Sequence, residues 1–145
     1  MLPPFNSTGD LPAGIHIAGW TEIEQRFGQN PEGRARAYAR LRHLHELADR
    51  TGALLRFIVF GSFVSTATVP RDVDVVLVMA ADFRLEDVPR ESRTLFSHPD
   101  AEARYGASVF WVREGMLPAE MMRDFLETWQ TKRDGTKRGI VEIKS

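Results

Sequence analysis

The sequence predicts an α/β protein of the α+β kind, in which helices flank a small, mixed and twisted sheet of about four strands. Amphipathic periodicity alternates along the chain with short apolar runs, which is typical of helices that pack against a sheet. The length of 145 residues, with 43% hydrophobic and 27% charged residues, is that of one ordinary globular domain. We therefore expect a single domain that spans residues 1–145.

A proline-rich N-terminal arm is expected over residues 1–19. Its first part contains several residues that interrupt helices and strands: Pro3, Pro4, Gly9, Pro12 and Gly14. Such a segment either lies over the rest of the domain or is loose.

Three helices are predicted from their apolar spacing and their boundaries. The first covers Trp20–Phe27 and ends before Gly28. The second, Pro31–Arg50, has apolar residues at helical spacing, and its arginines, Arg34 among them, are expected on its solvated face. The third covers Pro118–Thr131, where a proline suits the first turn and one side is apolar.

Apolar runs predict the strands. The first is Leu54–Phe60, and the second, Val73–Met79, holds four valines in seven positions with one aspartate. A run that is apolar on both faces is typical of a central strand covered on both sides. Shorter runs at Val109–Val112 and Gly139–Ile143 complete the sheet, and a polar segment with Pro89 lies between the second and third strands.

Composition and charge exclude several classes of function. The chain has no cysteine, which excludes disulfides, thiolate metal sites and cysteine nucleophiles and suits the cytosol. No run approaches the roughly 18 apolar residues of a membrane span, and the first residues lack the order of a signal peptide. We therefore expect a cytoplasmic protein without a membrane partner. A net charge of −1 provides no overall field for nucleic acid, so any polyanion must bind locally.

The most informative segment joins Gly61-Ser62 to Asp72-Val73-Asp74. Alternate side chains of a strand share a face, which places the Cα atoms of Asp72 and Asp74 about 6.6 Å apart on one side. Two carboxylates this close stay ionised at low cost only with a cation between them, and Mg²⁺ or Mn²⁺ held by oxygen ligands is the natural choice. Asp72 could instead stabilise a turn before the strand. Asp74, however, lies in an apolar run, where an unpaired carboxylate is costly.

Gly61 and Ser62 add a phosphate-binding corner to this pair. A residue without a Cβ lets a phosphate approach the backbone, and a serine hydroxyl at the start of a short helix can donate a hydrogen bond to it. Phe60 precedes this corner, and a spacer of about ten residues leads to Asp72 and Asp74. The pattern resembles the signature of the nucleotidyltransferase superfamily, which has a polymerase-beta-like fold.

The resemblance covers most of the chain. Three further segments are similar to a small bacterial and phage-associated branch of the superfamily: Leu11–His16, Arg26–Asn30 and Lys137–Ile143. The resemblance implies a nucleotidyltransferase-like domain in which Asp72 and Asp74 are catalytic and hold the metal, while Gly61 and Ser62 bind the nucleotide.

Active members of the superfamily have a third acidic residue on a later strand. The strand expected here, Ala107–Val112, has no carboxylate, and Ser108 occupies the place where the third acid belongs. A neutral hydroxyl there weakens metal binding and removes a base for an attacking hydroxyl. Glu142 is the candidate to replace it as a metal ligand, if the last strand lies beside the site.

A basic cluster near the C-terminus is the other candidate for phosphate binding. It consists of Lys132, Arg133, Lys137 and Arg138. The cluster is either a solvated turn or a site from which one cation, Lys137 for preference, reaches a triphosphate or a nucleic-acid phosphate. Trp129, like the other two tryptophans, is expected to be a core or interface anchor.

Three functions remain open. The first is an enzyme that binds a nucleoside triphosphate with Mg²⁺ and transfers a nucleotide to a hydroxyl of a protein, an RNA or a small molecule. The sequence resembles the minimal nucleotidyltransferases of toxin–antitoxin pairs, and this resemblance favours a protein as the acceptor. The second is a catalytically impaired nucleotide- or partner-binding module of a toxin–antitoxin or defence system. The third is a structural protein that binds no nucleotide. An oligomer is compatible with each.

Overall fold

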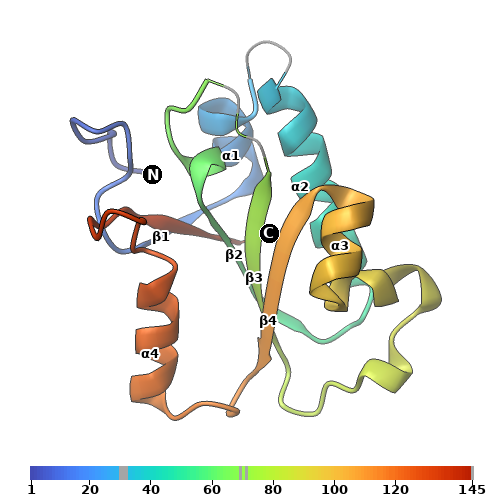
Figure 1. Cartoon of the computed structure of the whole chain (residues 1–145). Coiled ribbons are helices and arrows are strands. Elements are labelled where there is room, and N and C mark those ends of the chain that lie inside the picture. The colour runs from blue at the N-terminus through green and yellow to red at the C-terminus, as the bar shows by residue number, and fades with distance from the viewer. Residues whose placement is uncertain (30–32, 69, 71, 145) are drawn as a thin grey trace.

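The protein forms a mixed, five-stranded sheet with helices on both faces (Figure 1). The computed structural model describes residues 1–29, 33–68, 70 and 72–144. The strands are β1 (Ile15–Ala18), β2 (Leu54–Phe60), β3 (Val73–Met79), β4 (Ala107–Arg113) and β5 (Ile140–Ile143), in the order β1-β5-β2-β3-β4. β1 runs parallel to β5 and β3 runs parallel to β4, whereas β2 is antiparallel to both of its neighbours. The predicted α+β class with a mixed sheet is confirmed.

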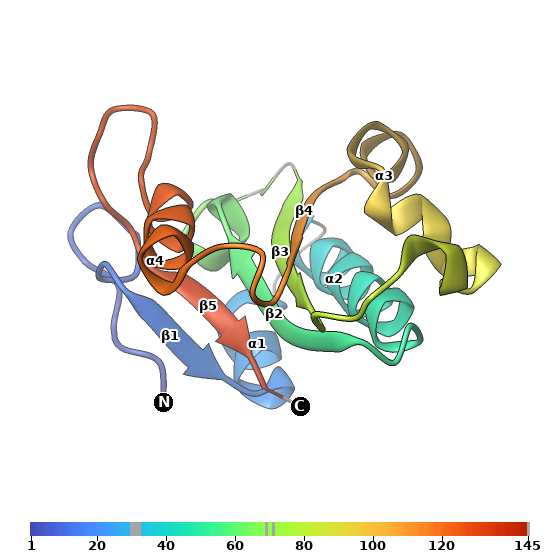
Figure 2. The same cartoon turned by 90° about the horizontal axis from the view of Figure 1, so that it is seen from below.

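The helices divide unequally between the two faces of the sheet. They are α1 (Trp20–Phe27), α2 (Gly33–Asp49), α3 (His98–Tyr105) and α4 (Ala119–Thr128), with short 3₁₀ turns at Ser62–Val64, Leu85–Asp87 and Arg90–Phe96. The first three cover one face and contribute to the larger core, while α4 alone covers the other face (Figure 2). Among the described residues, no helix has both the length and the apolar content needed to cross a membrane.

Strand alternation explains how both cores are filled. In β3, Val75 and Leu77 belong to the larger core, whereas Val76 packs with Leu126 of α4 in the smaller one. Every apolar residue of β3 is buried, so the strand is central and covered on both faces, as its composition predicts. Asp74 shares the α4 side with Val76, because residues two apart in a strand face the same way.

The N-terminal arm lies over the domain. Leu2 and Leu11 are buried in the larger core, and Asp10 forms an isolated antiparallel bridge with Ser65. The guanidinium of Arg26 on α1 donates hydrogen bonds to the carbonyl oxygens of Leu2 and Pro3. Of the two expectations for this arm, the packed one is confirmed.

Two elements differ from the sequence prediction. The last part of the predicted arm forms β1, which gives a sheet of five strands, because β5 offers it a parallel partner far away in the sequence. The polar segment before β4 contains α3, an eight-residue helix with a proline in its first turn and Gly106 in the left-handed conformation at its end. β4 also extends beyond the predicted Val109–Val112. Pro31, the predicted start of the second helix, lies outside the described residues.

Candidate functional site

A glycine corner brings the end of β2 against the start of β3. Gly61 directly follows β2 and has φ +85° and ψ −160°, a region that is essentially confined to glycine. Phe60 is the register partner of Asp74, and a Cβ on Gly61 would collide with the Asp74 carboxylate. The backbone conformation therefore requires glycine at this position, and a Cβ would in addition displace the Asp74 carboxylate.

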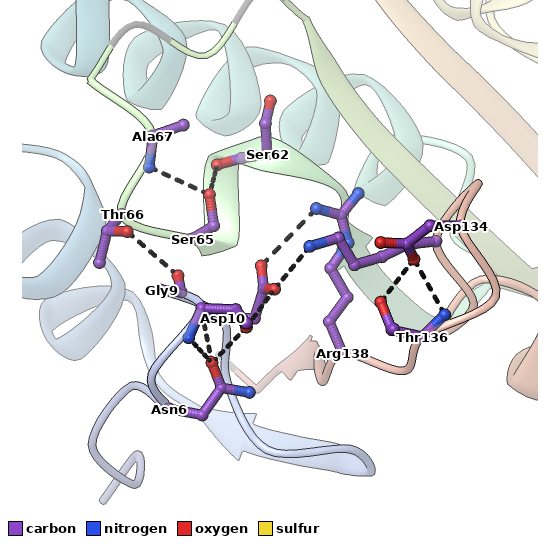
Figure 3. Close-up of polar contacts among 12 residues, drawn as sticks. Asn6, Gly9, Asp10, Ser62, Ser65, Thr66, Ala67, Asp134, Thr136 and Arg138 are labelled. Atoms are coloured by element: carbon purple, nitrogen blue, oxygen red, sulfur yellow. Dashed lines mark hydrogen bonds and ion pairs between the residues drawn. The ribbon is translucent and has the colours of Figure 1, made fainter.

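Ser62 begins the 3₁₀ turn Ser62–Val64 at this corner. Its carbonyl oxygen accepts hydrogen bonds from the Ser65 hydroxyl at 2.7 Å and the Ser65 backbone N–H at 3.2 Å. The Ser62 side chain is turned away from Ser65 and from the N-terminal arm (Figure 3). Ser62 as a whole is half-buried, so part of the residue remains exposed beside Gly61.

Arg34 of α2 holds the loop that follows Ser62. Its guanidinium donates hydrogen bonds to the carbonyl oxygens of Phe63 at 2.8 Å, Ser65 at 2.6 Å and Ala67 at 2.6 Å, and to Phe27 at 3.2 Å. The prediction that Arg34 lies on the solvated helix face is wrong, because only 8% of the residue is exposed. Loop carbonyls that have no strand partner require a donor, and the planar fork of arginine can satisfy several of them.

The two aspartates lie together at the start of β3. Asp72 precedes the strand and is exposed, whereas Asp74 is half-buried. Burial raises the pKa of Asp74, and the negative charge of Asp72 raises it further, while a hydrogen bond from Ser108 and the positive charge of Arg138 oppose these effects. Like charges that act on each other in this way are the setting in which a divalent cation is stabilising.

Ser108 occupies the position next to Asp74 on the neighbouring strand. β3 and β4 are parallel, and their register pairs Asp74 with Ser108. The register thus places Ser108 directly beside Asp74, on the strand where the sequence expected it. Its hydroxyl supplies a hydrogen bond to the Asp74 carboxyl, where a carboxylate would instead supply charge and a metal ligand.

Of the residues described above, Gly61, Asp74 and Ser108 line one open cleft of about 410 Å³, whereas Ser62 and Asp72 lie outside its lining. The sheet contributes Phe60, Gly61, Asp74, Ser108 and Phe110. The end of α4 and the following turn contribute Thr128, Trp129, Thr131, Lys132 and Arg133, and Arg138 completes the lining. The cleft therefore combines a carboxylate, three aromatic side chains and three cations.

Asp10 of the N-terminal arm holds two of these cations. Lys132 Nζ lies 2.9 Å from Asp10 Oδ2, and Arg138 Nη1 lies 3.8 Å from Asp10 Oδ1 (Figure 3). The Asp10 side chain is only 4% exposed, whereas those of Lys132 and Arg138 remain about a quarter exposed, at 28% and 25%. One buried carboxylate thus orients two cations that also face the cleft.

Lys137, the cation that the sequence favoured, does not reach this cleft. Its ammonium donates hydrogen bonds to Thr131 Oγ1 at 2.7 Å and to Glu127 Oε1 at 3.2 Å, and it lines a different groove with Ala13 and Ile15. The structure instead brings Lys132, Arg133 and Arg138 to the cleft. No signal in the basic cluster distinguishes its four members, because the conformation of the turn decides which of them face Asp74.

Glu142 is also placed away from the aspartates. Its register partner on β2 is Ile58, so two strand spacings, about 10 Å, separate its backbone from β3. Its carboxylate forms ion pairs of 2.8 Å with Arg56 and with Lys144. Burial alone would raise the pKa of Glu142, but hydrogen bonds from Arg56 and Lys144 outweigh it and lower the pKa. Glu142 is a partner of these two cations rather than of Asp74.

The donor set fits a cation that takes most of its ligands from a bound molecule. Within residues 1–29, 33–68, 70 and 72–144, no group of three or more histidine or acidic side chains is placed to hold a metal. Mg²⁺ is commonly held by one or two carboxylates together with phosphate oxygens and water. Asp72 and Asp74 can supply the carboxylates, and the ligands on the other side would come from a phosphate.

The model of one protein family, described as "Family of unknown function (DUF6932)", matches residues 3–144. The chain belongs to this family. The DUF6932 match spans the arm with Asp10, the Gly61 corner, both aspartates and the basic turn, so all parts of the cleft lie within the family region. No curated protein and no solved structure matches the chain.

Proposed function

We propose that this DUF6932 protein binds a nucleoside triphosphate together with Mg²⁺ or Mn²⁺ in the Asp74 cleft and, as a nucleotidyltransferase, transfers the nucleotide to a hydroxyl acceptor. The observation that carries the proposal is the contact of Gly61 with Asp74 in a cleft that also holds cations. A carboxylate that can hold a metal, held against a backbone corner and facing cations that can meet phosphates, is what a metal–triphosphate ligand needs.

The charges at the cleft favour a polyanion that brings its own cation. Three carboxylates, Asp10, Asp72 and Asp74, balance three cations, Lys132, Arg133 and Arg138. A divalent cation held by Asp72 and Asp74 would leave the site with two positive charges in excess. A triphosphate is the kind of ligand that compensates such an excess, whereas a neutral ligand does not.

Each residue has a defined role in this proposal. The phosphates lie against Gly61 and Ser62, and Lys132 and Arg138 orient the distal phosphates. Mg²⁺, when bound by Asp72 and Asp74, supplies charge neutralisation on the triphosphate. In the transfer, the acceptor oxygen bonds to the α-phosphorus, the bond to the bridging oxygen of the β-phosphate breaks, pyrophosphate leaves and the hydroxyl proton passes to solvent. The positioning of the acceptor supplies much of the rate.

The acceptor and the compartment belong to this proposal as well. A protein hydroxyl is the favoured acceptor, because the sequence resembles minimal nucleotidyltransferases of toxin–antitoxin pairs, and RNA or a small molecule is the alternative. The cysteine-free composition suits the cytoplasm, where nucleoside triphosphates are available.

A second candidate is a module that binds the nucleotide without transferring it. Ser108 stands beside Asp74 where a third carboxylate would lie, and Glu142 is held by Arg56 and Lys144 two strands away. Both observations favour binding over chemistry, because a third carboxylate would strengthen metal binding and accept a proton. Such a protein would serve as the nucleotide- or partner-binding component of a toxin–antitoxin or defence system.

Pyrophosphate release and nucleotide binding, measured on the same samples, distinguish these candidates. The full chain is incubated with each of the four ribonucleoside triphosphates and MgCl₂, with and without a cell extract as the source of acceptors. For the enzyme, we expect Mg²⁺-dependent pyrophosphate release that falls by about a hundredfold in Asp74→Asn. Asp82→Asn, an exposed aspartate beyond the other end of β3, is the matched control and should retain the activity.

Binding by calorimetry without pyrophosphate release would identify the second candidate. Absence of both binding and release at millimolar nucleotide would contradict the proposal and favour a structural protein.

A further inference from the structure

Three aromatic rings form one wall of the Asp74 cleft. Phe60 ends β2, Phe110 lies on β4 and Trp129 follows α4. The centroid of the Trp129 ring lies 4.7 Å from that of Phe60 and 4.4 Å from that of Phe110, each pair at an interplanar angle of 34°. We call these three residues the aromatic wall. All three line the same cleft as Gly61 and Asp74.

The wall differs from the core beneath it. Ile58, Val76, Leu126 and Ile140 are buried in the smaller core, whereas all three aromatic side chains stay partly exposed at its cleft end. The indole Nε1 of Trp129 is buried and has no hydrogen-bond partner in the described part of the chain. A buried donor without an acceptor is costly, and packing alone gives no reason to place one beside an open cleft.

The cleft combines two kinds of surface. Lys132 and Arg138 are held by Asp10, and Gly61 lies against Asp74, so charge and a close backbone approach are concentrated around these residues. The aromatic wall carries no charge. A ligand that matches both parts has an anionic end and a flat, uncharged aromatic end with hydrogen-bond acceptors.

We propose that the aromatic wall binds the base of the nucleotide by stacking, so that the site selects nucleotides over other triphosphate-bearing molecules. This inference rests on the proposed function and assigns its specificity to Phe60, Phe110 and Trp129. Every base has a π-face, so stacking tolerates all four bases. Purines present the larger face, and the site therefore binds them more tightly than pyrimidines.

The decisive measurement compares ATP with a ligand that lacks only the base and with one that lacks both base and ribose. Calorimetric titrations of the full chain in MgCl₂ use ATP, ribose 5-triphosphate and tripolyphosphate. We expect ATP to bind at least about tenfold more tightly than ribose 5-triphosphate, because stacking on an aromatic side chain contributes about that factor. The base-free triphosphate should bind about as well as tripolyphosphate.

Substitutions in the aromatic wall test whether it is the source of the preference for ATP over ribose 5-triphosphate. Trp129→Leu and Phe110→Leu should bring the affinities for ATP and ribose 5-triphosphate close to each other, and Trp129→Phe should keep most of the difference because it retains a ring. Phe125→Leu is the matched control, since Phe125 lies on α4 with its ring centroid 5.7 Å from that of Trp129 but does not line the cleft. It should leave the difference intact.

The outcomes separate this inference from the function on which it rests. Equal affinity of the unaltered protein for ATP and ribose 5-triphosphate overturns the stacking inference and leaves triphosphate binding in place. An ATP preference that survives both leucine substitutions also overturns it. No binding of any of the three ligands overturns the proposed function itself. If a leucine variant fails to fold, the comparison in the unaltered protein still decides.

Discussion

Gly61 shows how much one residue can determine at the residue scale. Its φ of +85° is open to glycine at little cost, and its missing Cβ lets the Asp74 carboxylate lie against the backbone. The sequence showed that glycine stands here, next to Ser62 and before two aspartates. The contact that makes it necessary depends on the pairing of β2 with β3, which brings Phe60 opposite Asp74.

Gly61→Ala should therefore destabilise the protein more than the same substitution at another glycine that has a similar φ but free space around its Cβ position. Gly115 has φ +82° with nothing near its Cβ position, so Gly115→Ala introduces mainly backbone strain. We expect a loss in the free energy of unfolding of about 1 kcal/mol for Gly115→Ala and about 3 kcal/mol for Gly61→Ala, measured by urea denaturation. Equal losses would contradict the contact with Asp74.

The raised pKa of Asp74 leads to a dependence of stability on pH. The folded protein holds the Asp74 proton more tightly than the unfolded chain, so stability falls as pH rises from the ordinary value of 3.8 through the raised pKa. In metal-free buffer, Asp74→Asn should raise the free energy of unfolding at neutral pH, and the gain should vanish below pH 3.8. Asp82→Asn should show no such gain. A variant less stable than the unaltered protein at neutral pH would oppose this account.

At the element scale, local pattern predicted most of the helices and strands, but not the contacts between them. β2, β3 and α1 have the predicted bounds, because their apolar periodicity is strong and their ends carry glycine or aspartate. β1 and α3 were not predicted. β1 has only four residues, including two exposed isoleucines, and it pairs with a strand at the other end of the chain. Such a short segment forms a strand only when a partner is present.

Arg34 tests the connection between α2 and the loop after Ser62. Arg34→Met keeps much of the side-chain length but leaves the carbonyl oxygens of Phe63, Ser65 and Ala67 without their donor. We expect a loss of about 3 kcal/mol in the free energy of unfolding, together with faster amide hydrogen exchange in the loop. Arg36→Met, an exposed arginine on the same helix, should change stability by less than about 0.5 kcal/mol. Similar losses for both variants would contradict the role of Arg34.

At the scale of the whole molecule, the N-terminal arm and the C-terminal turn meet beside the cleft. Asp10 binds Lys132 and Arg138, residues more than a hundred positions away, and it also pairs with Ser65 of the loop after Ser62. Three segments that are far apart in the sequence thus converge on one site (Figure 3). Two of the three cations of the cleft, Lys132 and Arg138, owe their orientation to the arm.

Asp10→Ala should loosen this junction. Loss of the buried carboxylate leaves Lys132 and Arg138 without their partner, and we expect a decrease of about 2 kcal/mol in the free energy of unfolding, less than for a fully buried pair because both cations are partly exposed. Limited proteolysis should cut the arm faster. Asp124→Ala, an exposed aspartate on α4, is the control and should change neither measurement. An unchanged rate of arm cleavage in Asp10→Ala would show that the junction does not hold the arm.

The sequence alone determined the class of fold, the central position of β3 and the succession of Gly61-Ser62 and two aspartates along the chain, because periodicity and short spacings act through neighbouring residues. Only the tertiary structure decided which cations face Asp74, why Glu142 does not, and that three aromatic residues from separate elements form one wall. These outcomes depend on strand order and on the path of the chain termini, which bring together residues that no local pattern connects.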